Sequence, residues 1–129
     1  VLLAGLATAG VDTRVHGFAV ARRAAELAPR IVALLADLAA LPGIAAVTAD
    51  RVLLDEGQLG IDYGVPTEAA AEAARLLATT EGILVDPIYT AKALAGLIAM
   101  VRRGELDGRT VVFWHAGGTP GLFEPLPTG

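Results

Sequence analysis

Apolar residues recur at helical spacing in four parts of the chain. Positions three or four residues apart share one face of an α-helix, so each pattern predicts a helix with one buried face. The first predicted helix ends at Gly10, a common residue just past a helix terminus, and the second is closed by Pro42-Gly43. The four patterns consist of Leu2, Leu3, Leu6 and Ala9; Leu27, Ile31, Leu34, Leu38 and Leu41; Ala70, Ala74, Leu77 and Ala78; and Leu94, Leu97, Ile98 and Val101.

Short apolar runs alternate with these helices. Residues 15–20, 52–54, 83–85 and 110–114 are rich in branched or aromatic side chains, and we predict that each contains a strand. The last run is almost continuously apolar, as expected of a strand buried on both faces. The alternation predicts an α/β fold in which a parallel sheet is flanked by helices.

The junction before the last helix holds side chains that are able to do chemistry. Asp86-Pro87 is a turn signal that prevents a helix from running through this part of the chain. Tyr89, Thr90 and Lys92 therefore lie at a strand-to-helix junction. In α/β domains, the carboxyl ends of strands and the amino ends of helices are where ligands, especially anionic ones, are held.

A second segment with polar and aromatic side chains precedes the third helix. Residues 55–65 contain glycines, acidic residues and Tyr63 but no regular period, which predicts a loop. Thr67 can cap the helix that follows, because a threonine hydroxyl accepts a hydrogen bond from a free backbone N–H at a helix start.

Composition narrows the class of protein. A length of 129 residues suits one domain, and 54% hydrophobic residues are ample for a core. The formal net charge of -4 argues against a nucleic-acid partner, which requires a basic surface. The longest apolar run, residues 31–47, is broken by Asp37 and Pro42-Gly43, so we predict no membrane span.

Cysteine and histidine usage limits the chemistry further. The chain has no cysteine, which excludes a disulfide framework and fits a reducing compartment, so we predict a cytoplasmic protein. His16 and His115 have no third ligand at regular spacing, and we predict no metal site.

Three motifs carry a family resemblance that covers nearly the whole chain. The run Glu-Gly-Ile-Leu-Val-Asp-Pro-Ile-Tyr-Thr-Ala-Lys-Ala over residues 81–93 resembles the corresponding run of the D-cysteine desulfhydrase and 1-aminocyclopropane-1-carboxylate deaminase family. The other two are Asp55-Glu56 with Tyr-Gly-Val-Pro-Thr-Glu over residues 63–68, and Trp-His-Ala-Gly-Gly over residues 114–118 before Pro120. They resemble motifs of the same family in the same order and at similar spacing.

The resemblance implies a cofactor and a fold. Enzymes of that family use pyridoxal 5'-phosphate and have the tryptophan synthase β-like fold, also called fold type II. We therefore expect residues 1–129 to be the carboxy-terminal part of the large domain of such an enzyme, because the chain begins inside an apolar helical pattern. The Schiff-base lysine and the phosphate loop would lie upstream, and the fragment alone would be inactive. Lys92, which is the sole lysine, matches a different lysine of the family, so we expect a structural or surface role for it.

The resemblance also assigns roles to four residues near the cofactor. It places Tyr89 against the cofactor ring as a catalytic residue and Tyr63 as a second active-site tyrosine, whereas the residues alone also allow both rings to be packing residues. Thr90 would face the pyridine nitrogen, where the deaminases carry glutamate and the desulfhydrases threonine; a helix cap is the alternative. Ala116 and Gly117 would contact the cofactor, although the paired glycines also suit a tight turn. Ala116 matches neither the leucine of the deaminases nor the threonine of the desulfhydrases.

These assignments predict a lyase that eliminates the β-substituent of D-cysteine and releases pyruvate, ammonia and hydrogen sulfide. The close alternatives are 1-aminocyclopropane-1-carboxylate deamination and elimination from another β-substituted amino acid such as cysteate. A different class of hypothesis is a non-catalytic α/β binding or dimerisation module. For the full-length protein we expect a small amino-acid substrate and a homodimer.

Overall fold

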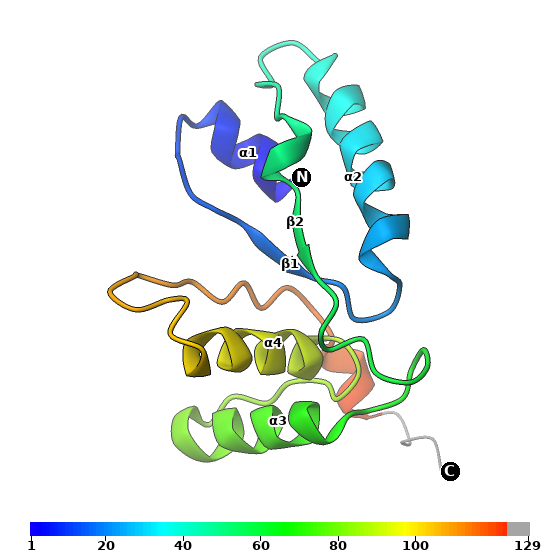
Figure 1. The fold of residues 1–129 in the computed structure, drawn as a ribbon, viewed down its shortest axis with the longest axis vertical. Helices are drawn as coiled ribbons and strands as arrows, with labels where there is room; N and C mark the ends of the chain where they lie inside the picture. Colours follow the sequence, from blue (N-terminus) through cyan, green and yellow to red (C-terminus); the bar gives the residue numbers. More distant parts are fainter. Residues whose placement is uncertain (124–129) are drawn as a thin grey trace.

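The computed structural model describes residues 1–123, which form two groups of elements joined by the chain that follows the second strand (Figure 1). One group contains α1, α2 and two short strands, and the other contains α3 and α4. In chain order the elements are α1 (Leu2–Thr8), β1 (His16–Phe18), α2 (Ala24–Ala39), the 3₁₀ turn η1 (Ala49–Arg51), β2 (Leu53–Asp55), α3 (Glu68–Glu81), α4 (Thr90–Arg102) and the 3₁₀ turn η2 (Thr119–Leu122).

The two strands form a parallel pair, with His16 opposite Leu53 and Phe18 opposite Asp55. The predicted alternation of strands with helices and the parallel pairing are therefore confirmed for these strands. Phe18 also joins the two groups, because a Cβ atom on Gly96 of α4 would overlap its ring. The strand pair is thus packed on the helix that carries the predicted site.

Helices α3 and α4 pack side by side through small residues. Thr67 caps α3 as predicted, since its hydroxyl accepts the N–H of Ala70 at 3.1 Å. Ala70, Ala73 and Ala91 are buried at the contact between the helices. Alanine lets two helices approach closely, and this contact orients the amino end of α4.

Two predicted strands are absent from the described residues. Residues 83–85 and 110–114 have no regular secondary structure, and the expectation that residues 110–114 are buried on both faces is wrong. Trp114 is 68% exposed, whereas Phe113 packs on the α3–α4 core. A strand needs a neighbouring backbone for its hydrogen bonds, and within residues 1–123 only β1 and β2 pair in this way. The apolar pattern shows that these segments suit a sheet, but it does not supply a partner strand.

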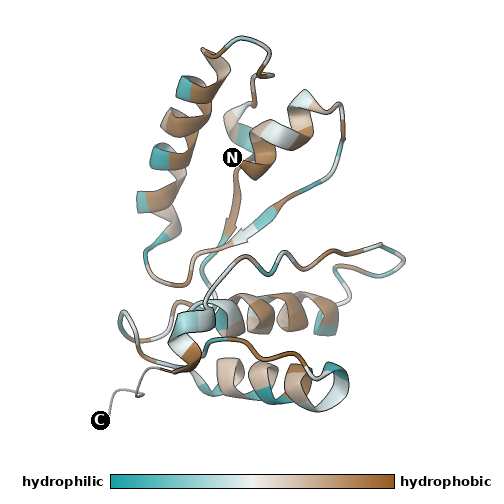
Figure 2. Cartoon of the chain, turned by 180° about the vertical axis from the view of Figure 1, so that it is seen from behind, coloured by the Kyte–Doolittle hydropathy of each residue, from teal (hydrophilic) through white to brown (hydrophobic). Residues whose placement is uncertain are grey.

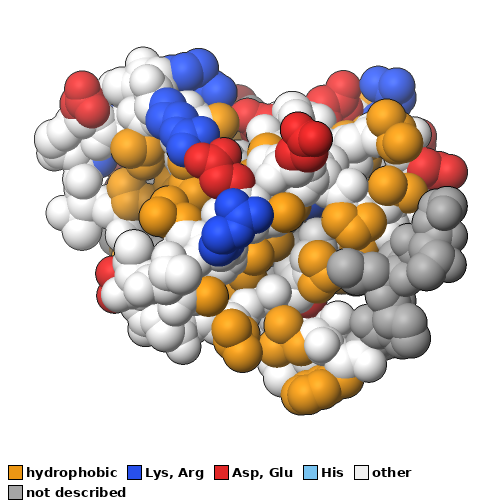
Figure 3. All heavy atoms as spheres, turned by 90° about the horizontal axis from the view of Figure 1, so that it is seen from below, with side chains coloured by type: hydrophobic (Ala, Val, Ile, Leu, Met, Phe, Trp, Pro, Cys, Tyr) orange, Lys and Arg blue, Asp and Glu red, His pale blue; other side chains and the backbone are white. Residues whose placement is uncertain are grey.

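Hydrophobic side chains consequently remain at the surface, among them Leu84, Val112 and Trp114. Figure 2 marks hydrophobic residues along extended segments as well as on the helices. The face seen from below carries several of them among its charged side chains (Figure 3).

Candidate functional site

The turn before α4 is organised by the carboxylate of Asp86, which is only 1% exposed. One oxygen accepts the backbone N–H groups of Ile88 at 3.0 Å and Tyr89 at 2.6 Å, and the other accepts that of Thr90 at 2.9 Å. The first N–H groups of a helix have no partner inside the helix, so a carboxylate in this place stabilises the helix start. Asp86 thereby fixes the backbone that carries Tyr89 and Thr90.

The electrostatics of this turn keep Asp86 ionised. Burial by itself raises the pKa of Asp86, but hydrogen bonds from the Thr90 hydroxyl and from the N–H groups of Tyr89, Thr90 and Ile88 outweigh burial. They hold the pKa below its ordinary value of 3.8. From the sequence, Asp86 was interpreted only as part of a turn. Its distance from the helix could have identified Asp86 as a cap, because the first helical residue follows this aspartate within four residues.

Tyr63 and Tyr89 meet although they are 26 positions apart in the sequence. Their hydroxyl oxygens are 2.5 Å apart, and their rings meet edge to face with centroids 6.4 Å apart. Tyr63 is 65% exposed and Tyr89 is 43% exposed, so neither ring is a core packing residue. Each phenol can donate or accept a hydrogen bond, and the pair can therefore pass a proton from one hydroxyl to the other.

The Thr90 hydroxyl is not the cap of α4. The helix begins at Thr90 itself, and the Asp86 carboxylate supplies the acceptor for its N–H, so the helix-cap alternative is wrong. The hydroxyl, which also bonds to the Asp86 carboxylate, lies 3.4 Å from the carbonyl oxygen of Gly117, so its single proton is shared between these two acceptors. Thr90 and Gly117 are thus brought together, as their assignment to one site requires.

The paired glycines have two different surroundings. Gly118 has a φ of +86°, and a Cβ atom there would overlap the Asp86 carboxylate and lie 2.9 Å from the Thr90 hydroxyl oxygen. Gly117 has a φ of +119° and nothing within 4 Å of where its Cβ would lie. Gly118 therefore allows the chain to approach Asp86, whereas the open side of Gly117 leaves room for a ligand. Ala116 is exposed beside it.

Lys92 is completely buried on α4, and its amine donates a hydrogen bond to the backbone oxygen of Leu59 at 2.9 Å. Burial lowers the pKa of this amine. Of the two roles expected for Lys92, the structural one is observed. An amine held in this way is not available to a ligand beside Tyr89.

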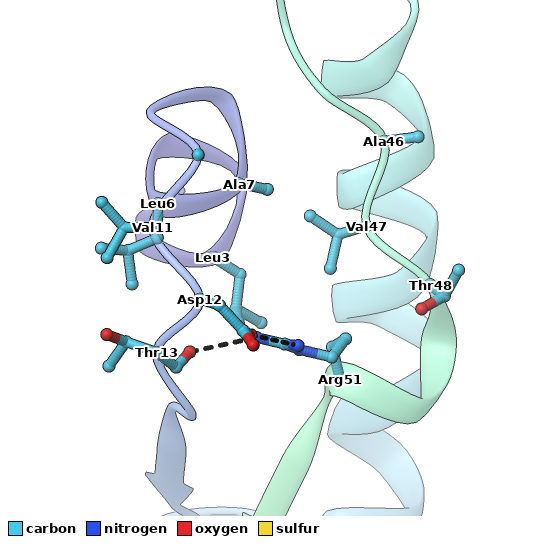
Figure 4. Close-up of a pocket in the computed structure, with 11 residues that line it drawn as sticks. Leu3, Leu6, Ala7, Val11, Asp12, Thr13, Ala46, Val47, Thr48 and Arg51 are labelled. Atoms are coloured by element: carbon cyan, nitrogen blue, oxygen red, sulfur yellow. Dashed lines mark hydrogen bonds and ion pairs between the residues drawn. The ribbon is translucent and has the colours of Figure 1, made fainter.

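Two hollows of the molecule lie away from these residues. One of about 320 Å³ lies between α1 and residues 46–51, and Figure 4 shows Arg51 at its edge, bonded to Asp12 at 2.9 Å and to the Thr13 carbonyl at 3.2 Å. None of the predicted site residues lines it. Tyr63, Tyr89 and Gly117 are exposed and Thr90 is half-buried, so these residues lie at the surface.

Residues 1–123 contain neither a cluster of metal ligands nor a membrane-spanning helix. No group of three or more histidine, cysteine or acidic side chains in this range is arranged to hold a metal ion. None of the helices described there is both long enough and apolar enough to cross a membrane.

Comparison with known proteins covers almost all of the chain. The model of the pyridoxal-phosphate dependent enzyme family matches residues 2–117. D-cysteine desulfhydrases of Salmonella newport and Salmonella heidelberg are each 41% identical over 127 residues, which are 98% of this chain and 38% of each relative. A crystal structure of an ACC deaminase homologue superimposes with a TM-score of 0.74 at 33% identity, covering 84% of this chain and 32% of that one. The chain thus spans 38% of the length of these D-cysteine desulfhydrases and 32% of the ACC deaminase homologue.

Proposed function

This chain belongs to the family of pyridoxal-phosphate dependent enzymes, and we propose that it is part of a lyase of the D-cysteine desulfhydrase type. Its net reaction would be the conversion of D-cysteine and water to pyruvate, ammonia and hydrogen sulfide. The observation that carries the proposal is the contact between the Tyr63 and Tyr89 hydroxyls directly beside Thr90. The identity to D-cysteine desulfhydrases over nearly all of the chain supports it.

The side chains at the amino end of α4 fit the cofactor by their chemistry. We propose that Thr90 faces the pyridine nitrogen, that the Tyr89 ring lies against the cofactor, and that Ala116 and Gly117 contact it. A neutral hydroxyl, an aromatic ring and an open glycine backbone suit a flat heteroaromatic ligand. When bound, pyridoxal phosphate supplies an electron sink for negative charge on the substrate α-carbon.

The anchoring amine has to come from elsewhere. Lys92 is the sole lysine of the chain, and its amine is buried and bonded to Leu59. We propose that residues 1–129 form one part of a larger cofactor domain, and that both the anchoring lysine and the phosphate loop belong to another part of the protein. The part described by this sequence would then be inactive alone.

The two phenols would handle a proton near the substrate. Elimination breaks the bond between the β-carbon and sulfur after the α-proton has left, so sulfur departs with negative charge that a donor can stabilise. We propose that the Tyr89 hydroxyl donates to this sulfur atom and that Tyr63 orients Tyr89 and replenishes its proton. A phenol O–H is a hydrogen-bond donor and can act in this way.

Substrate tests on the full-length holoenzyme decide between the alternatives. We expect D-cysteine to yield pyruvate and sulfide in equal amounts. Pyruvate from cysteate without turnover of D-cysteine would assign the enzyme to another β-substituted amino acid. 2-Oxobutyrate from 1-aminocyclopropane-1-carboxylate, with no sulfide from D-cysteine, would make it a deaminase.

A non-catalytic module is the remaining alternative. It predicts a purified protein without the visible absorbance of a bound cofactor and without turnover of any of these substrates.

Between the two enzyme activities, Thr90 favours the desulfhydrase over the deaminase. A neutral partner of the pyridine nitrogen gives a weaker electron sink than a glutamate, and a thiolate leaves more readily than a cyclopropane ring opens.

We also propose a cytoplasmic homodimer for the full-length protein. The absence of cysteine fits a reducing compartment, and exposed hydrophobic side chains such as Trp114 and Val112 are available for contacts. Light scattering after size exclusion tests the dimer, and fractionation of cells tests the compartment. A monomeric mass or a membrane-associated fraction would contradict the respective proposal.

A further inference from the structure

We propose that Lys92 is a positioning residue, whose buried amine ties the loop of residues 56–66 to helix α4 and so holds the phenol of Tyr63 against Tyr89. The effect of Lys92 on turnover rests on the proposed function. Its effect on the mobility of the loop does not rest on that function, and the two effects can be measured separately.

The burial of Lys92 is unusual and calls for a physical reason. Its side chain is 0% exposed, whereas lysine is almost never fully buried unless it is paired. The ion pairs among residues 1–123 are made by arginines, and Lys92 takes part in none of them. Its buried neighbours on α4 include Ala91, Leu94 and Ala95, which offer no acceptor from their side chains.

The acceptor comes from the loop. The Lys92 amine donates to the Leu59 carbonyl at 2.9 Å. A Cβ atom on Gly60, which has a φ of +81°, would lie 3.2 Å from the amine nitrogen and 3.0 Å from a Thr67 methyl carbon. The loop backbone therefore passes directly over the end of the lysine side chain, and it can do so because residue 60 is a glycine.

The same loop meets α4 at a second point. Tyr63 bonds to Tyr89, while Leu59 bonds to Lys92. Tyr89 and Lys92 are three residues apart at the start of α4, so they lie on one face of the helix. Between the two contacts the loop is exposed, with Ile61 almost entirely in solvent. The loop is thus held to one helical turn at two points, and the Lys92 contact is the buried one.

An apolar side chain could fill the space of Lys92, but it could not bond to Leu59. With methionine at this position, the Leu59 carbonyl would lose its donor, and the loop would lose its buried attachment. Tyr63 would then depend on its exposed contact with Tyr89. We therefore expect Lys92→Met to loosen the loop while the helix core remains filled.

The first measurement is hydrogen exchange in the full-length holoenzyme. In Lys92→Met we expect amide exchange of residues 56–65 to accelerate about tenfold, with exchange in α3 unchanged. Met100→Leu is the matched control, because Met100 is buried on the same helix and forms no part of the loop contact. Unchanged loop exchange in Lys92→Met would overturn the inference.

A second variant disturbs the same contact from the loop side and keeps the amine. Gly60→Ala places a methyl group against Lys92 and Thr67, and we expect it to accelerate exchange of residues 56–65 as well. Gly64→Ala is its control, since Gly64 lies in the same loop at a φ of +75° but has nothing within 4 Å of where its Cβ would lie. If Lys92→Met fails to fold, the comparison of these two variants decides the question. Equal loop exchange in Gly60→Ala and Gly64→Ala would contradict the inference.

The third measurement asks whether Lys92 acts through Tyr63. We expect Lys92→Met to lower kcat about tenfold with KM and cofactor absorbance nearly unchanged, and to lower it less than about twofold in a Tyr63→Phe background. If the losses of kcat in Lys92→Met and Tyr63→Phe multiply in the double variant, Lys92 does not act through Tyr63, and the inference is overturned. Faster loop exchange together with full activity of Tyr63→Phe would leave the anchor intact and refute the catalytic role of Tyr63.

Discussion

The half of the molecule built from α3 and α4 buries two ionisable side chains, whereas within residues 1–123 the half built from α1, α2 and the strands buries none. Asp86 and Lys92 lie on either side of Tyr89 and Thr90, and each is tied to backbone atoms. The other half contains a hollow of about 320 Å³, with the exposed ion pair of Asp12 at its edge. Burying an ionisable group costs free energy. This cost therefore falls on the half that carries the proposed site residues, and not on the half that contains this hollow.

The largest effect is expected from the phenol that the α3–α4 half presents. Tyr89→Phe removes the proposed donor and should lower kcat about 100-fold or more, with the visible absorbance of the cofactor retained. Steady-state kinetics of the holoenzyme with D-cysteine measure this loss. Near-normal turnover in Tyr89→Phe would mean that the α3–α4 half does not supply the proton donor.

The next effect concerns the buried carboxylate. Asp86→Asn places an amide beside the backbone N–H groups of residues 88–90, so we expect a loss of about 2 kcal/mol in the free energy of unfolding. Turnover should fall about 30-fold as Tyr89 and Thr90 shift. Asp12→Asn is the matched control in the other half, where an exposed ion pair contributes little. Equal stability of the two variants in urea would contradict the comparison.

A smaller effect separates two glycines of similar backbone conformation. Gly118→Ala strains a residue at φ +86° and also pushes a methyl group into Asp86, whereas Gly10→Ala strains a residue at φ +68° in open space. We expect Gly118→Ala to cost about 1 to 2 kcal/mol more than Gly10→Ala, because only the first adds a steric overlap to the backbone cost. Chemical denaturation of both variants measures the difference, and equal costs would show that Asp86 yields without penalty.

The smallest effect is a dependence on pH. The pKa of Asp86 is lowered by folding, so its carboxylate stabilises the folded protein fully above its unfolded value of 3.8. That contribution is lost as the pH falls through the lowered folded pKa. The stability difference between wild type and Asp86→Asn should therefore narrow as the pH is lowered from about 6 to about 3. A difference that stays constant over this range would show that the carboxylate does not titrate as described.

Local structure was predicted correctly where the residues that determine it lie close together in one segment. The Thr67 cap and the start of α4 follow from residue types close together in the chain. Residues 110–114 show the limit, since an apolar run does not reveal whether another strand lies beside it. The extent of the sheet therefore could not be predicted from side-chain patterns.

The candidate site shows the same limit at the level of single residues. Tyr63, Tyr89, Thr90 and Gly117 were grouped through the family resemblance, and the structure brings them together in pairs. The burial of Asp86 and Lys92 was not foreseen. Burial depends on distant parts of the chain, namely Gly118 for Asp86 and the Leu59–Gly60 backbone for Lys92.

The capping of α4 has a consequence for how enzymes of this kind can diverge. The Asp86 carboxylate accepts the backbone N–H of residue 90, so the direction of the side chain at this position does not depend on which residue stands there. If Thr90 faces the pyridine nitrogen as proposed, an exchange of threonine for glutamate would alter the electronic partner of the ring while the surrounding backbone stayed as it is. A single codon would then shift the reaction preference of an otherwise unchanged protein.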